Sequence, residues 1–463
     1  MINNIGQYNS NNIKNLQSTP SVKQSFNGAK LTGAASEPSF LFFPLRKENV
    51  SNISAPKTKL TTKEEFDSYN ALLYAFSTSD TEKTSPQDNV SRQTKLDALL
   101  KNGVLLNNNS NDKSTVLQNL TKTINNPRAA NMDNLKIAGQ IIDTLYNPAI
   151  ITQRFGDIPK EAQTFVMNKD IEGNFVKGAN GSINLQGSGT CVAASVEFHM
   201  ANKHPAEFSR WAESLTSPEI SVKKAINLSA LSKNPMNAIW LLREFGVKPE
   251  TMNFYKAKLN LKPDENAIVR AQIQDNYWDM GERSILDVLF QSTLMQLGSQ
   301  QSYNSLTDMR AGKFNSNPQG LIEFEKTFIE SIVENQERTS IVYQNVDNDQ
   351  NLLGWNTDLS VIQKHITDTI DMGEDVIAGY VLTAKECNEP ADNPNKIVNG
   401  HEITIVGYRK GLDGKLTFVC NDTDDDKNKF VEYSADYLLP KIHHAGYPVA
   451  IVEDGTQATK QVA

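Results

Sequence analysis

The stretch QGSGTCVAAS, residues 186 to 195, sets the direction for the rest of the chain. Two glycines, Gly187 and Gly189, precede the cysteine Cys191, and small or apolar residues follow it at once. This pattern predicts a tight loop that runs into a helix, with Cys191 in the first turn of that helix. Unpaired N–H groups and the dipole at a helix start stabilise a thiolate, which makes Cys191 a candidate nucleophile. The alternative is a buried thiol that serves only in packing.

The residue patterns beyond this loop favour an α+β fold. Apolar residues at helical spacing occur in the ranges 191–203, 234–250, 284–298, 320–335 and 358–370. After them the pattern changes to alternating or continuous apolar runs, typical of strands, in the ranges 375–382, 401–408, 415–421 and 447–454. Helices first and strands later indicate an α+β domain.

The chain divides into three expected parts. Residues 1–58 are rich in Asn, Ser, Lys and Pro and have weak periodicity, so we expect a disordered leader. Residues 59–148 carry amphipathic helical patterns and end at Pro148, which predicts an N-terminal helical region. Its position ahead of Cys191 raises the hypothesis of a pro-region that occupies the active-site cleft. Residues 149–463 are expected to form the main domain.

Composition excludes several classes of partner. The 463 residues carry a net charge of −8 without a basic stripe, so we expect no nucleic-acid binding. No window reaches the roughly 18 apolar residues of a membrane span, and we find no secretory signal peptide at the N-terminus. Three cysteines, an odd and sparse set, do not form a disulfide framework. Localisation stays open between the cytoplasm and export by a non-classical route.

A nucleophilic cysteine needs a histidine partner on another element. Of the six histidines, His401 is the best candidate because it opens the strand expected over residues 401–408. Side chains alternate along a strand, so His401 lies on the same face as Ile403 and Ile405. A histidine at the start of a buried strand would project from a rigid edge into a cleft.

Two further groups complete the candidate constellation. The strand after His401 ends in Asn421 and Asp422. If the two strands pair as a hairpin, one of these acceptors returns near His401 and orients its imidazole. Gln186, upstream of Cys191, carries an amide NH₂ that is a candidate oxyanion donor.

The other histidines are weaker candidates for a catalytic or metal-binding role. We expect His443 and His444 at the surface or in a turn. His199 and Glu197 lie on the helix that follows the cysteine loop, but neither HExxH nor paired cysteines occur. We therefore expect no metal site and no cofactor.

The sequence has Gln-Gly before a cysteine that opens a helix, then GHEITIVGY at residues 400–408, and then a strand ending in Asn. These three features together resemble the papain-like cysteine peptidases. The resemblance covers roughly residues 150–455, with a long helical insertion between about 255 and 355. It implies a papain-like α+β fold, in which a helical subdomain carries the cysteine and an antiparallel β subdomain carries His and Asn. Matched residue by residue, the resemblance implies Cys191 as the nucleophile, His401 as the general base, Asn421 as the orienting residue and Gln186 as the oxyanion donor. Asp422 is the alternative orienting residue.

The chain also departs from the family pattern. Gln186 lies five residues before Cys191, where the family has six, and Val192 replaces the usual aromatic residue. No Trp follows Asn421. These differences indicate a divergent member.

The expected function is a thiol-dependent acyl-transfer hydrolase, most simply a cysteine peptidase that cleaves amide bonds of a protein or peptide substrate. The same chemistry serves a transglutaminase or deamidase on the same fold. A catalytically inactive papain-fold interaction protein is the non-enzymatic alternative.

Overall fold

The computed structural model describes residues 56–78, 88–154, 189–227, 239–248, 257–276, 283–311, 320–424 and 430–449. Gln186 and nearly all of the expected leader lie outside these residues. The described chain is α+β, with helices dominant before residue 335 and an antiparallel sheet after it. None of the described helices has the length and the apolar character that a membrane crossing requires.

The N-terminal region is helical, with α1 (Lys63–Thr78), α2 (Arg92–Lys101), α3 (Val116–Asn125) and α4 (Asn134–Tyr146). The last three begin at residues that favour helix starts, because the side chains of Ser91, Thr115 and Asp133 each accept a backbone N–H three residues further on. The four helices bury their apolar faces in the same core as the central helices.

The centre of the molecule contains α6 (Cys191–Lys203), α7 (Pro205–Leu215), α9 (Ala267–Asn276), α10 (Ile285–Gly298) and α11 (Glu323–Glu334). The sequence pattern did not predict α7, although Pro205 at its first position is a typical helix start. The helix expected over residues 234–250 is a 3₁₀ helix, η3 (Ile239–Phe245), in its described part. Gly246 follows it with φ +73°, a conformation that favours glycine.

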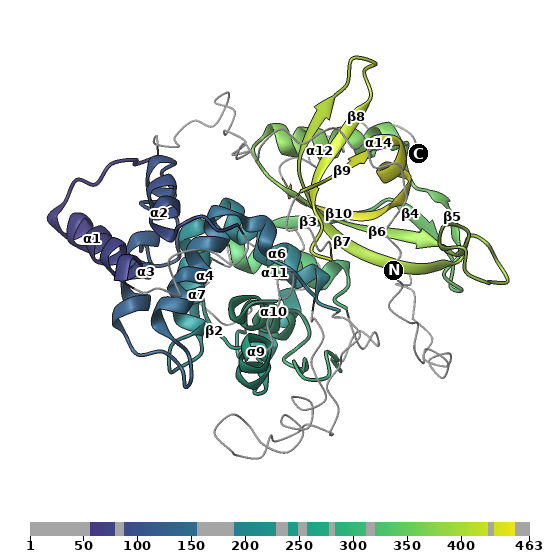
Figure 1. Cartoon of the computed structure of the whole chain (residues 1–463). Coiled ribbons are helices and arrows are strands. Elements are labelled where there is room, and N and C mark those ends of the chain that lie inside the picture. The colour runs from purple at the N-terminus through teal and green to yellow at the C-terminus, as the bar shows by residue number, and fades with distance from the viewer. Residues whose placement is uncertain are drawn as a thin grey trace.

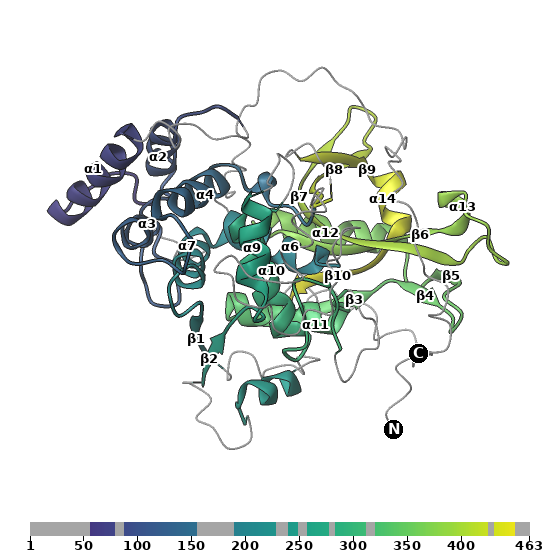
Figure 2. The same cartoon turned by 60° about the horizontal axis from the view of Figure 1, so that its bottom comes forward.

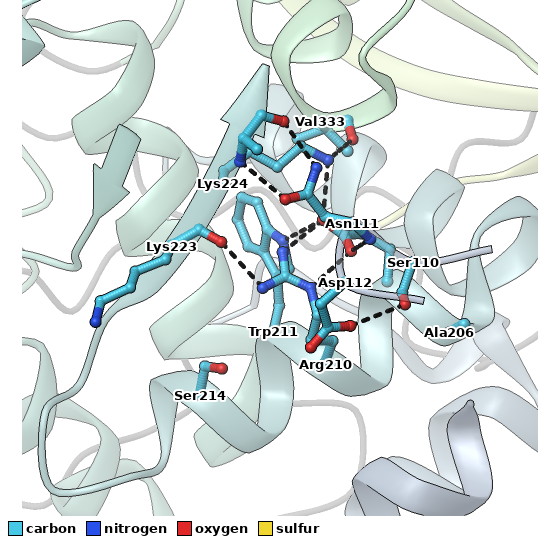
Figure 3. Close-up of polar contacts among 12 residues, drawn as sticks. Ser110, Asn111, Asp112, Ala206, Arg210, Trp211, Ser214, Lys223, Lys224 and Val333 are labelled. Atoms are coloured by element: carbon cyan, nitrogen blue, oxygen red, sulfur yellow. Dashed lines mark hydrogen bonds and ion pairs between the residues drawn. The ribbon is translucent and has the colours of Figure 1, made fainter. Parts of the chain in front are cut away.

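A buried carboxylate joins the N-terminal region to α7 and to β1 (Val222–Ile226). At 2.7 to 3.0 Å, Glu207 accepts hydrogen bonds from Arg210, Trp211, Lys224 and the backbone N–H of Asn111. Figure 3 shows these four partners close together. Burial by itself would raise the pKa of Glu207, but its cationic partners hold that pKa well below the usual range. Polar contacts therefore reinforce the shared apolar core.

The main sheet has the strand order β3–β10–β6–β7–β8–β9 in the described chain, and all neighbouring pairs are antiparallel. Its strands are β3 (Arg338–Val342), β6 (Val376–Thr383), β7 (Ile397–Lys410), β8 (Leu416–Asn421), β9 (Val431–Ser434) and β10 (Ile442–Pro448). Alternate residues enter two different cores: Ile403 and Ile405 join α12 (Leu359–Asp371) and α14 (Ala435–Leu438), whereas Val406 joins the helical core after a bulge.

The N-terminal helices lie at one end of the molecule and the sheet at the other, with α6, α10 and α11 between them (Figures 1 and 2). The segment expected as a helical insertion holds α9, α10 and α11, but it also holds strands. Among these, β3 is an edge strand of the main sheet. The remaining described elements are β2 (Ala257–Leu261), which pairs with β1, then β4 (Gln344–Val346) paired with β5 (Leu352–Trp355), α13 (Ala384–Cys387), η2 (Pro148–Ile150) and η4 (Leu439–Lys441).

Candidate functional site

Helix α6 begins at Cys191, at the position that the sequence pattern predicted. Its N-cap residue, Thr190, does not cap the first turn with its side chain, but donates its hydroxyl to Oε1 of Gln291 at 2.8 Å. The first N–H groups of the helix therefore receive no side-chain cap from Thr190, and they lie next to the thiol. Cys191 is a free, half-buried cysteine at the margin of the helical core. Uncapped N–H groups at a helix start attract negative charge.

Small residues allow α6 to lie against strand β7. Ala193, Ala194 and Ser195 are fully buried, and Oγ of Ser195 donates to the backbone carbonyl of Glu402 at 3.5 Å. The contact fixes the first turns of the helix beside the strand that carries His401. The first turns of α6 therefore lie next to the part of β7 that begins at His401.

His401 lies between Cys191 and Asp422. Its Nε2 atom is 2.8 Å from Oδ1 of Asp422, and the side chain of Cys191 is near enough to interact electrostatically with its imidazole. Tyr380, directly opposite on β6, packs edge-on against the ring with a centroid distance of 5.8 Å. The side chains of His401 and Asp422 are 13% and 11% exposed, so solvent reaches the pair only at its margin.

The charges at the site favour the imidazolium form of His401. Burial lowers its pKa, but the charge of Asp422, its hydrogen bond and the contact with Cys191 outweigh burial and raise the pKa well above 6.5. Burial also raises the pKa of Asp422, yet His401 and two further donors lower it below its usual value. These donors are the Tyr433 hydroxyl at 3.0 Å and the Asp424 N–H at 3.1 Å.

Of the two residues that we expected as candidates to orient His401, Asn421 and its neighbour Asp422, it is Asp422 that contacts the imidazole. Thr404 is the cross-strand partner of Asn421, and extending this register by one pair sets Asp422 opposite Ile403. Asp422 is then a diagonal neighbour of His401 on the same face of the sheet. Asn421 points to the other face, where it is 1% exposed and its Oδ1 has no hydrogen-bond partner in the described chain.

Two residues that the sequence analysis did not identify hold the cysteine loop. Asp308, fully buried, accepts a hydrogen bond from the backbone N–H of Gly189 and another from the Tyr303 hydroxyl at 2.7 Å. Gln291, also fully buried on α10, holds Thr190. Both lie more than a hundred residues beyond the loop, and no short motif connects them to Cys191.

Gln291 also reaches the other side of the site. Its Nε2 atom donates to the carbonyl of Thr152 at 2.8 Å. The Thr152 hydroxyl and the Gln153 N–H in turn donate to the carbonyl of Thr423, at 2.9 and 3.0 Å. Thr423 directly follows Asp422. The buried amide of Gln291 therefore connects Thr190, which precedes Cys191, with Thr152. Thr152 in turn holds Thr423, the residue after Asp422.

His443 and His444, expected at the surface or in a turn, lie in β10, and His444 contacts a buried ion pair. Glu402 accepts from Nζ of Lys326 at 3.2 Å, and its other oxygen is 2.6 Å from Nε2 of His444. Burial raises the pKa of Glu402, but these two partners outweigh burial and lower it to about 2. A Cβ at Gly379 would overlap the His444 ring, so glycine makes this contact possible. The two histidines are half-buried and lie in a strand instead of a turn, because pairing with β6 and β3 draws this segment into the sheet.

The expected oxyanion donor, Gln186, lies outside the described residues. Two surface hollows of the described chain lie over α1 and α3 and over α7 and β1, and neither is lined by Cys191 or His401. The candidate site is therefore identified from the contacts among its side chains and not from a surface hollow. No protein-family model matches the chain, and no curated protein matches its sequence.

Proposed function

We propose that the chain is a thiol-dependent acyl-transfer hydrolase that cleaves amide bonds of a protein or peptide substrate. We also propose that its α+β fold is a divergent papain-like fold. The single observation that supports this most strongly is the imidazole of His401, which is hydrogen-bonded to Asp422 and interacts electrostatically with the nearby side chain of Cys191. A nucleophile, a base and a residue that orients the base are the three parts that covalent acyl transfer requires.

The first half of the reaction forms a thioester. The Cys191 thiolate attacks the substrate carbonyl carbon, and the resulting oxyanion is held by the N–H groups at the start of α6 and, in this proposal, by the Gln186 amide. The His401 imidazolium then gives its proton to the amide nitrogen as the C–N bond breaks. The amine leaves, and the acyl group stays on sulfur.

The second half releases the acid. His401, now neutral, takes a proton from water while the water oxygen attacks the thioester carbonyl. The C–S bond breaks, the carboxylic acid leaves, and the thiolate–imidazolium pair is restored. Asp422 remains ionised throughout, because its role is to fix the ring orientation and stabilise the imidazolium.

The test separates peptide cleavage from the other reactions of an acyl-thioenzyme. Purified protein and its Cys191→Ala variant are incubated with unfolded protein substrates, and new N-termini and free ammonia are both measured. Thiol-dependent new N-termini support the peptidase. Ammonia without cleavage indicates a deamidase, and incorporation of an added amine indicates a transglutaminase. No Cys191-dependent product in any assay would support the inactive interaction protein.

A further inference from the structure

A second cluster of ionisable groups lies at the other end of the helix that begins with Cys191. His199 is on α6, His204 immediately follows α6, and Glu334 is the last residue of α11. One nitrogen of each histidine and one carboxylate oxygen of Glu334 all lie within 4.8 Å of one another. Three side chains from two packed helices thus present nitrogen and oxygen donors to one small volume.

His199 is buried and His204 is half-buried, and three of their ring nitrogens make no hydrogen bond in the described chain. His199 is 2% exposed, and neither of its ring nitrogens has a hydrogen-bond partner in the described chain. The same is true of Nε2 of His204. Buried polar atoms are almost always satisfied, yet Nε2 of His204 has no hydrogen-bond partner in the described chain, and the nitrogens of His199 have only carboxylate oxygens at 3.3 and 3.5 Å.

The surroundings of His199 match those of a metal-bound imidazole. Its Nδ1 is 3.5 Å from Oδ2 of Asp375, on the side away from Glu334, whose Oε1 is 3.3 Å from Nε2. Metal-binding histidines usually direct their second nitrogen at a carboxylate, which fixes the ring and leaves the other lone pair for the ion. Asp375 is itself held, by Nδ2 of Asn202 at 2.8 Å and Nζ of Lys203 at 3.2 Å.

We propose that His199, His204 and Glu334 bind a divalent transition metal, with Zn²⁺ as the preferred ion and Asp375 as the residue that orients His199. Two imidazoles and one carboxylate form a donor set that suits Zn²⁺. The second oxygen of Glu334 is 2.6 Å from Arg338, which leaves the first oxygen for the ion. The metal links the end of α6 to α11 and holds in place the helix whose start carries Cys191. Glu334 lies 130 residues after His204, so no local sequence motif marks the site.

The experiment uses the full chain carrying Cys191→Ala, because a thiol beside an imidazole can itself bind zinc. Protein dialysed against a chelator is loaded with Zn²⁺ and desalted, and bound zinc is measured by elemental analysis. We expect about one equivalent of zinc, lost on adding His204→Gln or Glu334→Gln. Asp375→Asn should weaken zinc affinity by about 10- to 100-fold. His365→Gln, on α12 outside the cluster, is the matched control and should retain the zinc.

A second measurement does not depend on whether the variants fold. Co²⁺ added to the Cys191→Ala chain should give the visible absorption of a four- or five-coordinate N/O site, without a thiolate band. A chain that retains no zinc and gives only the weak absorption of hydrated Co²⁺ overturns the proposal. Full retention of zinc in the His204 and Glu334 variants, with circular dichroism unchanged, overturns it equally. In either case the cluster is a buried imidazolium held by two carboxylates.

Discussion

Nε2 of His401 lies 2.8 Å from Oδ1 of Asp422, and the same ring interacts electrostatically with the nearby side chain of Cys191. Cys191 and His401 are 210 residues apart in the sequence and are brought together because α6 packs on β7. The proposed chemistry depends on this packing as much as on the three side chains.

Replacing Asp422 should reduce catalysis far more than replacing Asn421. Asp422→Ala removes the acceptor that orients the imidazole, and we expect kcat to fall by about 10³- to 10⁴-fold. Asn421→Ala should change mainly the free energy of unfolding, because Asn421 is buried on the opposite face. Steady-state kinetics and urea unfolding of both variants check this. Equal losses of kcat would contradict the assignment of the orienting role to Asp422.

Asp422→Asn should move the alkaline limit of activity to lower pH. The pKa of His401 is raised above 6.5, so the imidazolium persists above pH 6.5 and is lost only as the pH rises through that higher value. Asparagine keeps a hydrogen-bond acceptor but removes the carboxylate charge, a main cause of the raised pKa. The dependence of kcat/KM on pH measures the shift. An alkaline limit that is identical in the variant and the parent would argue against an imidazolium paired with Asp422.

Gln291→Leu should lower kcat although Gln291 touches no reacting atom. The change removes the contacts with Thr190 and Thr152 that hold both sides of the site. We expect a loss of about 10- to 100-fold, since small displacements of catalytic groups cost this much. Gln272→Leu is the matched control, because Gln272 is also buried and donates one hydrogen bond, to the Ala130 carbonyl, away from the site. If both variants lose the same activity, the effect is one of general stability.

Removing residues 1–148 should unfold the protein rather than activate it. Ile137, Ile141 and Ile142 of α4 are fully buried in the core that also contains α6 and α10. Even Ile141→Ala should lower the free energy of unfolding by about 2–5 kcal/mol. Circular dichroism and activity of a chain that starts near residue 150 check the prediction. A folded and more active truncated chain would instead support the pro-region hypothesis.

The local patterns in the sequence predicted the elements that carry the site. The glycine-rich loop indicated a helix start, and α6 begins at Cys191. The apolar alternation after His401 indicated a strand, and β7 contains it. These signals are local, so one stretch of sequence contains them. The expectation of no metal site near His199 also rested on the lack of local motifs. A local motif cannot include Glu334, which lies far away in the sequence.

Long-range register and packing could not be predicted from the same patterns. Adjacent residues of a strand point to opposite faces, so the choice between Asn421 and Asp422 depends on how β8 pairs with β7. The contacts of Asp308 and Gln291 with the cysteine loop join segments more than a hundred residues apart. Neither has a sequence signature, because any buried acceptor of suitable size at those positions would serve.

The most direct test of the central claim is the reactivity of the three cysteines in the native protein. The protein and its His401→Ala variant are treated with iodoacetamide over a series of pH values, and labelling is mapped by mass spectrometry. Burial raises the pKa of Cys387 and of Cys420, so both should label slowly. We predict that Cys191 labels at lower pH than either of them and loses this advantage in His401→Ala. Labelling of Cys191 no earlier than the other two, or unchanged by the loss of His401, would contradict the thiolate–imidazolium pair.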